Sequence, residues 1–161
     1  MVPESDITCR NIFIESMFKA AETTPRKAAF SEFGGVSHSW SEFAERVSSI
    51  ARTIAHADPD VGASDRPLAI LTDRGVLSAE AIFGAMAAGR WYTAVDSGLP
   101  PERIAAMVGI CSPSAVVCAS DQLSSSGFSQ LRDIIGAACP GTVFIDLAAE
   151  KAAGAVTGTR D

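Results

Sequence analysis

The chain has 161 residues, of which 47% are hydrophobic and 20% are charged, and this composition is typical of a folded globular domain rather than a disordered segment. It carries 13 lysine and arginine residues against 19 aspartate and glutamate residues, and the resulting net charge of −6 argues against nucleic acid or an anionic membrane as a partner. No run of 18 apolar residues occurs and the first residues lack the pattern of a signal peptide, so the sequence predicts neither a membrane span nor secretion.

The first part of the chain predicts a helix followed by a hairpin. Apolar residues at mostly three- and four-residue steps indicate a short amphipathic helix over residues 7–22. Residues 27–40 are typical of two strands, and Gly34-Gly35 between them predicts a tight two-residue turn, because glycine adopts the positive φ angles that such a turn needs.

A second amphipathic helix is predicted directly after the hairpin. Ser39 and Glu42 have the spacing of a capping box, in which each side chain satisfies a backbone N–H at the helix start. Residues 57–65 are predicted to form a loop. The apolar residues behind the capping box repeat along one helix face, and they are Phe43, Val47, Ile50, Ala51 and Ile54.

From residue 68 onward, short apolar runs alternate with helical stretches. This alternation indicates right-handed βαβ units and a parallel sheet, in which central strands are buried on both faces. The predicted strands are residues 68–71, 91–95, 115–119 and 142–147, and the predicted helices are residues 76–88, 100–108 and 127–138, with Gly89 as the C-cap of the first.

The predicted fold class is therefore α/β, with an N-terminal helix and β-hairpin followed by βαβ units that form a mainly parallel sheet with helices on both faces. Residues 1–147 would form a single domain, and the Ala-, Gly- and Thr-rich residues 148–161 would form a flexible tail or a severed linker.

The cysteines and histidines predict no zinc site, because no CxxC pair occurs and the ligand types are widely spaced. Unpaired cysteines are commonly buried, so we expect buried free thiols and a reducing, cytoplasmic location. The residues concerned are Cys9, Cys111, Cys118, Cys139, His38 and His56.

Polar residues follow three of the predicted strands, at the end of the sheet where ligands bind in open α/β folds. The segments are Thr72-Asp73-Arg74-Gly75, Asp96-Ser97-Gly98 and Ser120-Asp121. They form a candidate ligand-facing rim. Because Asp, Ser and Thr in front of a helix commonly serve as N-caps, we expect these residues to cap helices rather than to face a ligand.

No motif assigns chemistry to a particular residue. The sequence contains neither GxxxxGK[ST], nor GxGxxG, nor GxSxG, and residues 154–161 combine glycine and threonine without a lysine or a following helix. Trp91 and Tyr92 are candidates for lining a pocket, but packing within the sheet is the expected role of such a pair. The sequence therefore predicts no catalytic, cofactor-binding or metal-ligating residue.

Two segments of the chain resemble the first two core motifs of adenylation enzymes. Ser39-Trp40-Ser41-Glu42-Phe43 is similar to the first motif, and AGRWYTAVDSGLPPER at residues 88–103 is similar to the second, typically AGxAYVPLDPxYPxER. Residues 18–25 and 67–71 are similar to the opening helix and the first buried strand of the family. The resemblance covers roughly residues 11–120 and is strongest to the amino-acid-activating domains of nonribosomal peptide synthetases. The second motif departs from the family pattern at Ala94, Ser97 and Leu99.

The resemblance implies the N-terminal subdomain of an AMP-forming carboxylate-activating ligase, whose reaction joins a carboxylate to ATP with Mg²⁺ and releases pyrophosphate. The phosphate loop with its lysine, the substrate pocket and the C-terminal lid of that family have no counterpart in this sequence. We therefore expect a truncated or split enzyme that binds no cofactor alone and does not turn over by itself. Its partner would be the missing remainder of an adenylation domain, or a second copy of the chain.

Two other functions fit parts of the pattern. A non-catalytic docking or regulatory module derived from an adenylation domain would expose an apolar patch to its partner. A small nucleotide- or flavin-binding protein of flavodoxin-like shape fits the alternation of strands and helices, but Asp73 would repel a phosphate after the first parallel strand.

Overall fold

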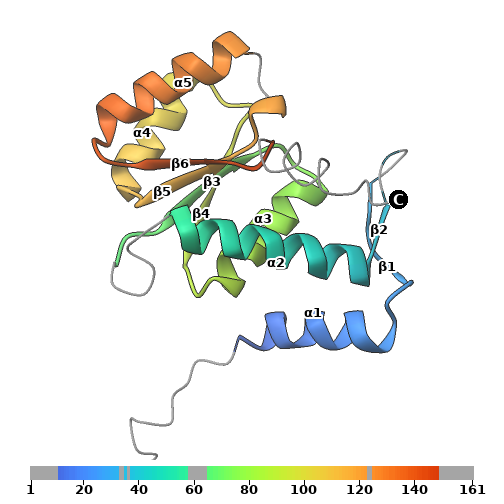
Figure 1. Ribbon diagram of the computed structural model, residues 1–161. Coiled ribbons are helices and arrows are strands. Elements are labelled where there is room, and N and C mark those ends of the chain that lie inside the picture. The colour runs from blue at the N-terminus through green and yellow to red at the C-terminus, as the bar shows by residue number, and fades with distance from the viewer. Residues whose placement is uncertain (1–10, 33–34, 36, 58–64, 123–124, 149–161) are drawn as a thin grey trace, which may run out of the picture.

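The computed structural model describes residues 11–32, 35, 37–57, 65–122 and 125–148. Its elements follow the predicted order of helix, hairpin and helix, and then alternating strands and helices (Figure 1). The α/β fold class predicted from the sequence is confirmed. The helices are α1 (Ile12–Thr23), α2 (Trp40–Ala57), α3 (Val76–Ala87), α4 (Pro101–Cys111) and α5 (Ser125–Ala138), and the strands are β1 (Ala28–Ser31), β2 (Ser37–Ser39), β3 (Leu68–Thr72), β4 (Tyr92–Asp96), β5 (Ala115–Cys118) and β6 (Val143–Asp146).

The four later strands form one parallel sheet in the order β4-β3-β5-β6. Every side chain of β3 and β5 is buried, as expected for strands in the middle of a sheet covered on both faces. The chain passes from β3 to β4 through α3 and then returns across β3 to β5 through α4. Because βαβ connections are right-handed, this reversal places α4 and α5 on the face opposite α3.

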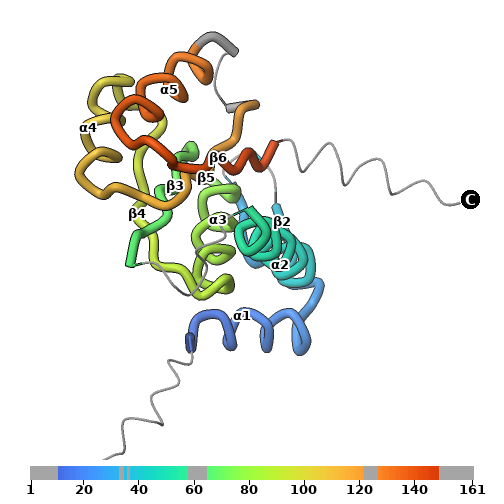
Figure 2. The backbone as a smooth tube through the Cα atoms, turned by 60° about the vertical axis from the view of Figure 1, so that its left-hand side comes forward, coloured from blue at the N-terminus to red at the C-terminus, as the bar shows by residue number. Residues whose placement is uncertain are grey.

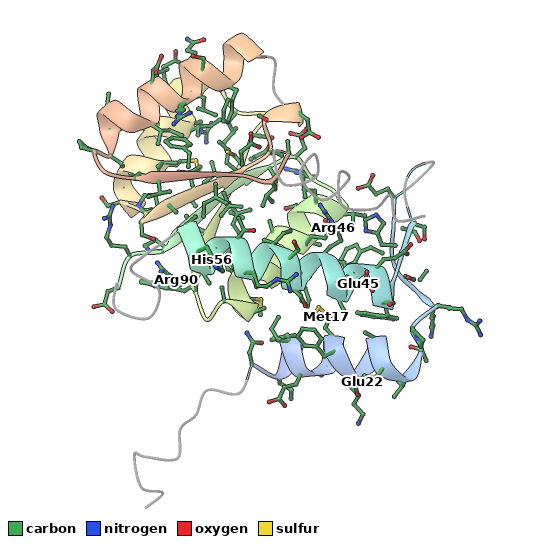
Figure 3. The ribbon with its side chains drawn as sticks, in the orientation of Figure 1. Met17, Glu22, Glu45, Arg46, His56 and Arg90 are labelled. Carbon is green, nitrogen blue, oxygen red and sulfur yellow. The ribbon has the colours of Figure 1, made fainter. Side chains whose placement is uncertain are left out.

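Helices cover both faces of the sheet. Ile50 and Ile54 of α2 pack with Leu68 and Ile70 of β3 on one face, together with residues of α3. The other face packs against α4 and α5, and Val108 and Ile135 belong to that second core. Figure 2 shows α1 outside the layer of α2 and α3, on the side away from the sheet. Met17 lies buried between α1 and α2 (Figure 3).

The hairpin lies beside one end of α2 rather than in the main sheet (Figure 1). Its last antiparallel pair joins Ser31 to Ser37, so five residues connect the two strands. Gly34 of the predicted two-residue turn lies outside the described residues. The turn includes a hydrogen bond from the Gly35 N–H to the Glu32 carbonyl (3.1 Å). Glu32, the first residue of this connection, reaches the start of α3.

The predicted capping box at the start of α2 is confirmed. The Ser39 backbone N–H donates to Glu42 Oε2 (2.8 Å), and the Glu42 N–H donates to Ser39 Oγ (3.3 Å). The hydrogen bonds from Ser39 lower the pKa of the Glu42 carboxyl group below its ordinary value of 4.5. Of the predicted helix face, Phe43, Val47, Ile50 and Ile54 are buried and Ala51 is half-buried.

Helix ends differ from the predictions by a few residues. The Ile14 N–H donates to Asn11 Oδ1 (3.4 Å), and this cap starts α1 at Ile12, whereas residues 7–10 of the predicted helix lie outside the described residues. Helix α3 has Ala88 as its C-cap, and Gly89 follows with φ of +70°, the left-handed conformation that glycine adopts readily. The predicted tail, residues 148–161, lies outside the described residues except for Ala148.

Helices α2 and α3 approach each other closely at a glycine. Gly84 of α3 is buried against Ile50 of α2, and a Cβ atom at Gly84 would lie 2.5 Å from Ile50 Cγ2 and 2.9 Å from Ile50 Cβ. Such distances leave no room for a methyl group, so this contact requires glycine. None of the helices within the described residues has the length and apolar content that a bilayer crossing needs.

Candidate functional site

The reversal of the chain direction defines the expected ligand site. Strand β3 has β4 on one side and β5 on the other, and the connecting helices lie on opposite faces of the sheet. Open α/β folds bind ligands outside the carboxyl ends of strands at such a switch point. The three polar segments of the predicted rim all follow strands at this edge, so the structure does bring them to the same end of the sheet.

The loops after β3 and β4 are joined to each other by side-chain contacts. Ser97 Oγ donates a short hydrogen bond to Asp73 Oδ1, and Arg74 Nη2 lies 3.1 Å from Asp96 Oδ2. Asp96 Oδ1 also accepts from the Gly98 N–H (2.9 Å), which closes a local turn. The rim carboxylates therefore connect two loops. They are not N-caps, because the N-caps of α3 and α4 are Gly75 and Pro100, and this part of the structural prediction is wrong.

A carboxylate from the hairpin occupies the start of α3. The Val76 N–H donates to Glu32 Oε1 (2.6 Å), although the two residues are 44 positions apart. A Cβ atom at Gly75 would collide with the same Glu32 oxygen. A negative charge at a helix N-terminus is favourable, because the first N–H groups have no partner within the helix and carry a partial positive charge. Glu32 thus takes the place that an anionic ligand would take.

The loop after β5 is held by Asp146 at the end of β6. Asp146 Oδ1 accepts from the N–H groups of Ser120 and Ala148, both at 3.0 Å. Asp121, the third acidic residue of the predicted rim, is exposed in a short 3-10 turn over Ser120–Gln122. The side chains at this edge thus serve largely to fix the loops.

The chemical capacity of this edge is limited within the described residues. Its cationic side chain, Arg74, is exposed and already faces Asp96, and Asp73 adds a further acidic group. Thr72 Oγ1 is buried at the end of β3 and makes no hydrogen bond with a described residue. No group of three or more His, Cys, Asp or Glu side chains in the described ranges is placed to hold a metal ion. Such an arrangement offers a polyphosphate little electrostatic stabilisation.

One polar cluster was not predicted from the sequence. Glu80 of α3 is 2% exposed, and its carboxyl oxygens lie 2.8 Å from His38 Nδ1 of β2 and 3.4 Å from Arg46 Nε of α2. The cluster joins the hairpin to both helices of one layer. Glu80 is the single charged residue in the sequence of α3. A lone charge in an otherwise uncharged helix was the sequence signal from which a buried, paired carboxylate could have been predicted.

The described cysteines are free, and two of them are inaccessible. Cys118 and Cys139 are buried and Cys111 is half-buried, whereas Cys9 lies outside the described residues. Burial, with a smaller contribution from the Asp146 carboxylate, raises the pKa of the Cys118 thiol to about 12. A thiol with such a pKa is not a nucleophile at neutral pH, so the predicted structural role of Cys118 agrees with its surroundings.

Trp91 and Tyr92 do not pack inside the sheet, and the sequence prediction that they would is wrong. Trp91 is 59% exposed and Tyr92 is also exposed, because β4 is the edge strand of the sheet. Both side chains line a groove at the amino ends of β3 and β4, away from the rim. The alternative reading, that this pair lines a pocket, is the one that the structure supports.

Comparison with known proteins identifies relatives in sequence. The family model described as AMP-binding enzyme matches residues 17–159. Bacitracin synthase 1 of Bacillus licheniformis is 34% identical over 118 residues, which cover 71% of this chain and 2% of that protein. Fumosorinone synthetase of Cordyceps fumosorosea is 27% identical over 108 residues, which cover 63% of this chain and 2% of that protein.

Solved structures share the fold. The nonribosomal peptide synthetase FmoA3, in its form with bound alpha-methyl-L-serine-AMP, matches 83% of this chain and 14% of its own chain, with 24% identity and a TM-score of 0.61. MatB of Rhodopseudomonas palustris, in its apo form, matches 81% of this chain and 24% of its own, with 18% identity and a TM-score of 0.64. The chain thus spans a small part of every one of these relatives, between 2% and 24% of their length. This protein belongs to the AMP-binding enzyme family.

Proposed function

We propose that this chain is the N-terminal scaffold of an AMP-forming carboxylate-activating ligase and that it does not turn over by itself. The observation that carries the proposal is the combination of a family match over residues 17–159 with a span of only 14–24% of the solved relatives. The activity of a complete enzyme would be the condensation of a carboxylate with ATP to an acyl-adenylate and pyrophosphate. ATP and Mg²⁺ would then bind mainly to polypeptide outside this chain.

The electrostatics of the described rim support the inactivity of the isolated chain. Transfer of an adenylyl group develops negative charge on pyrophosphate, and enzymes stabilise such charge with lysine or arginine side chains, backbone N–H groups and metal ions. At the carboxyl edge, Arg74 is already paired with Asp96, and Glu32 occupies the start of α3. The rim therefore contributes loop geometry rather than charge stabilisation.

The test is carboxylate-dependent exchange of labelled pyrophosphate into ATP, measured with a panel of amino acids and small carboxylic acids. The isolated chain should give no exchange above a buffer control. The same chain recovered from its source, together with any longer polypeptide that contains or accompanies it, should give exchange that requires Mg²⁺ and one carboxylate. Exchange by the isolated chain refutes the inactivity.

A non-catalytic docking module is the second candidate function, and the exposed aromatic and apolar residues near β4 favour it. If the recovered material holds the rest of an adenylation domain and still shows no exchange with any carboxylate, the scaffold proposal fails and the docking module gains support. The two functions are therefore separated by the same assay.

A further inference from the structure

A groove of about 460 Å³ lies at the amino ends of β3 and β4. Its walls come from the residues before β3, the start of β4 and the end of α4. Seven large hydrophobic side chains of the described residues are exposed, and three of them, Trp91, Tyr92 and Ile110, line this groove. Ile110 is the most exposed of the seven, at 85%. Large apolar side chains gathered at one exposed place commonly mark an interaction surface, since each leaves apolar area in water.

The groove is balanced in charge, although the chain is not. Among the described residues, the charged side chains that line it are one acid, Asp65, and one base, Arg66. The Arg66 guanidinium is held at the wall, because Nε donates to the Ser112 carbonyl (2.8 Å) and Nη2 donates to the Pro113 carbonyl (2.6 Å). The whole chain has a net charge of −6, so two copies repel each other on average. At this groove two copies can approach without that repulsion.

The groove also complements itself in shape. A contact between two identical copies related by a twofold axis uses the same patch on both, so the patch must supply both halves of the fit. Here Ile110 projects into solvent from the last turn of α4, beside the concave surface that Trp91 lines. Asp65 and Arg66 supply both signs of charge within the same patch. A partner of one charge sign, such as a nucleic acid, would be matched by a groove of the opposite sign instead.

We propose that this groove is a twofold contact between two copies of the chain. Ile110 of each copy enters the groove of the other beside Trp91, and the acid of one patch faces the base of the other. The rim lies at the opposite, carboxyl end of the sheet, so both rims stay accessible in the dimer. This inference does not rest on the proposed function, because neither a nucleotide nor a carboxylate takes part in the contact.

The first test measures dimer formation by sedimentation, over protein concentrations that cover dissociation constants from about 1 µM to about 1 mM. The groove variant is Ile110→Ser, and the matched control is Ile12→Ser on α1, where the native isoleucine is 67% exposed. Twofold symmetry removes two isoleucines from the contact at once, so Ile110→Ser should weaken the dimer at least about tenfold. Ile12→Ser should leave the dissociation constant within about twofold. Both positions are exposed, so we expect melting temperatures close to that of the unmodified chain.

A second pair of variants tests the charge balance. Asp65→Arg and Asp121→Arg change the net charge of the chain by the same amount, and both native side chains are exposed. Asp65→Arg leaves only cations in the groove, so like charges then face each other and the dimer should weaken at least about fivefold. Added salt should reduce this loss, because it screens exposed charges. Asp121→Arg, on the rim, should leave the dimer as strong as that of the unmodified chain or strengthen it.

Cys111 reports whether the dimer uses this surface. Its half-buried thiol lines the groove, so dimer formation should cover it. The rate at which iodoacetamide modifies Cys111 should therefore fall as the protein concentration rises through the range in which dimers form. In Ile110→Ser the same rate should stay constant over that range.

Each outcome decides the proposal. A chain that stays monomeric over the whole concentration range overturns it, and so does a dimer that Ile12→Ser weakens as much as Ile110→Ser does. A dimer that Asp121→Arg weakens as much as Asp65→Arg, or whose formation leaves the alkylation of Cys111 unchanged, uses another surface and overturns it as well. A dimer that both groove variants weaken and that protects Cys111 supports the proposal. Pyrophosphate exchange tests the proposed function separately, so the two can fail independently.

Discussion

The close approach of α2 and α3 gives the most direct test of the structure. Replacing Gly84 by alanine places a methyl group 2.5 Å from Ile50 Cγ2 and 2.9 Å from Ile50 Cβ. Ile50 is fully buried and β-branched, so its side chain has few rotamers with which to retreat. The two helices must therefore separate or tilt to admit the methyl group.

Two opposing effects determine how much Gly84→Ala changes the free energy of unfolding. Alanine favours a helix interior over glycine by about 1 kcal/mol, whereas overpacking a tight core costs about 1–3 kcal/mol. We expect the second effect to prevail, with a loss of about 1 kcal/mol in the free energy of unfolding. Gly136 of α5 offers the matched control, since a Cβ atom there meets no atom within 4 Å. Gly136→Ala should therefore gain up to about 1 kcal/mol.

The assay is urea unfolding followed by circular dichroism, with the unmodified chain and both alanine variants at the same concentration. The free energies of unfolding of the two variants should shift in opposite directions from that of the unmodified chain and differ by about 2 kcal/mol. Ile50→Ala removes the Cγ2 atom, so combining it with Gly84→Ala should cost less than the sum of the separate losses. If Gly84→Ala stabilises the protein as much as Gly136→Ala does, the close packing of α2 against α3 is wrong.

Three further predictions follow from the described contacts. Glu80→Gln should lower the free energy of unfolding by about 1–3 kcal/mol, because it leaves the half-buried His38 and Arg46 without their buried, charged partner. Glu45→Gln on the exposed side of α2 should change the free energy of unfolding by less than about 0.5 kcal/mol in the same urea titration. The lowered pKa of Glu42 contributes stability at pH above its ordinary value of 4.5, and this stability is lost as the pH falls through the lowered pKa. Glu42→Gln should therefore flatten the fall in the urea unfolding midpoint between pH 5 and more acid solution. An unchanged slope of midpoint against pH contradicts the assignment. In native protein at pH 8, iodoacetamide should modify Cys111 well before Cys118, as peptide mass spectrometry can measure, and equal rates would contradict the burial of Cys118.

Local patterns in the sequence were sufficient for the elements and the fold class. The alternation of apolar runs with helical stretches predicts βαβ units, because a parallel sheet needs a long crossover between neighbouring strands. The capping box of Ser39 and Glu42 is also local, since its two members are three positions apart and satisfy each other. The burial of Cys118 and Cys139 follows from the apolar segments that contain them. Each of these predictions depends only on residues that are close together in the chain.

The tertiary structure decided the contacts between distant segments. Glu32 reaches Val76 across 44 positions, and Glu80 meets His38 across 42, and no local pattern indicates either pairing. The same holds for the rim, where residues predicted to cap their own helices instead join two neighbouring loops.

The order of the strands made the largest difference for function. A run such as residues 91–95 predicts a strand, but the sequence does not say whether that strand lies in the middle of the sheet or at its edge. Because β4 lies at the edge, Trp91 faces water, and a residue expected to pack within the sheet lines an exposed groove instead. Strand order depends on packing between elements far apart in the chain, and for that reason only the folded structure determined it.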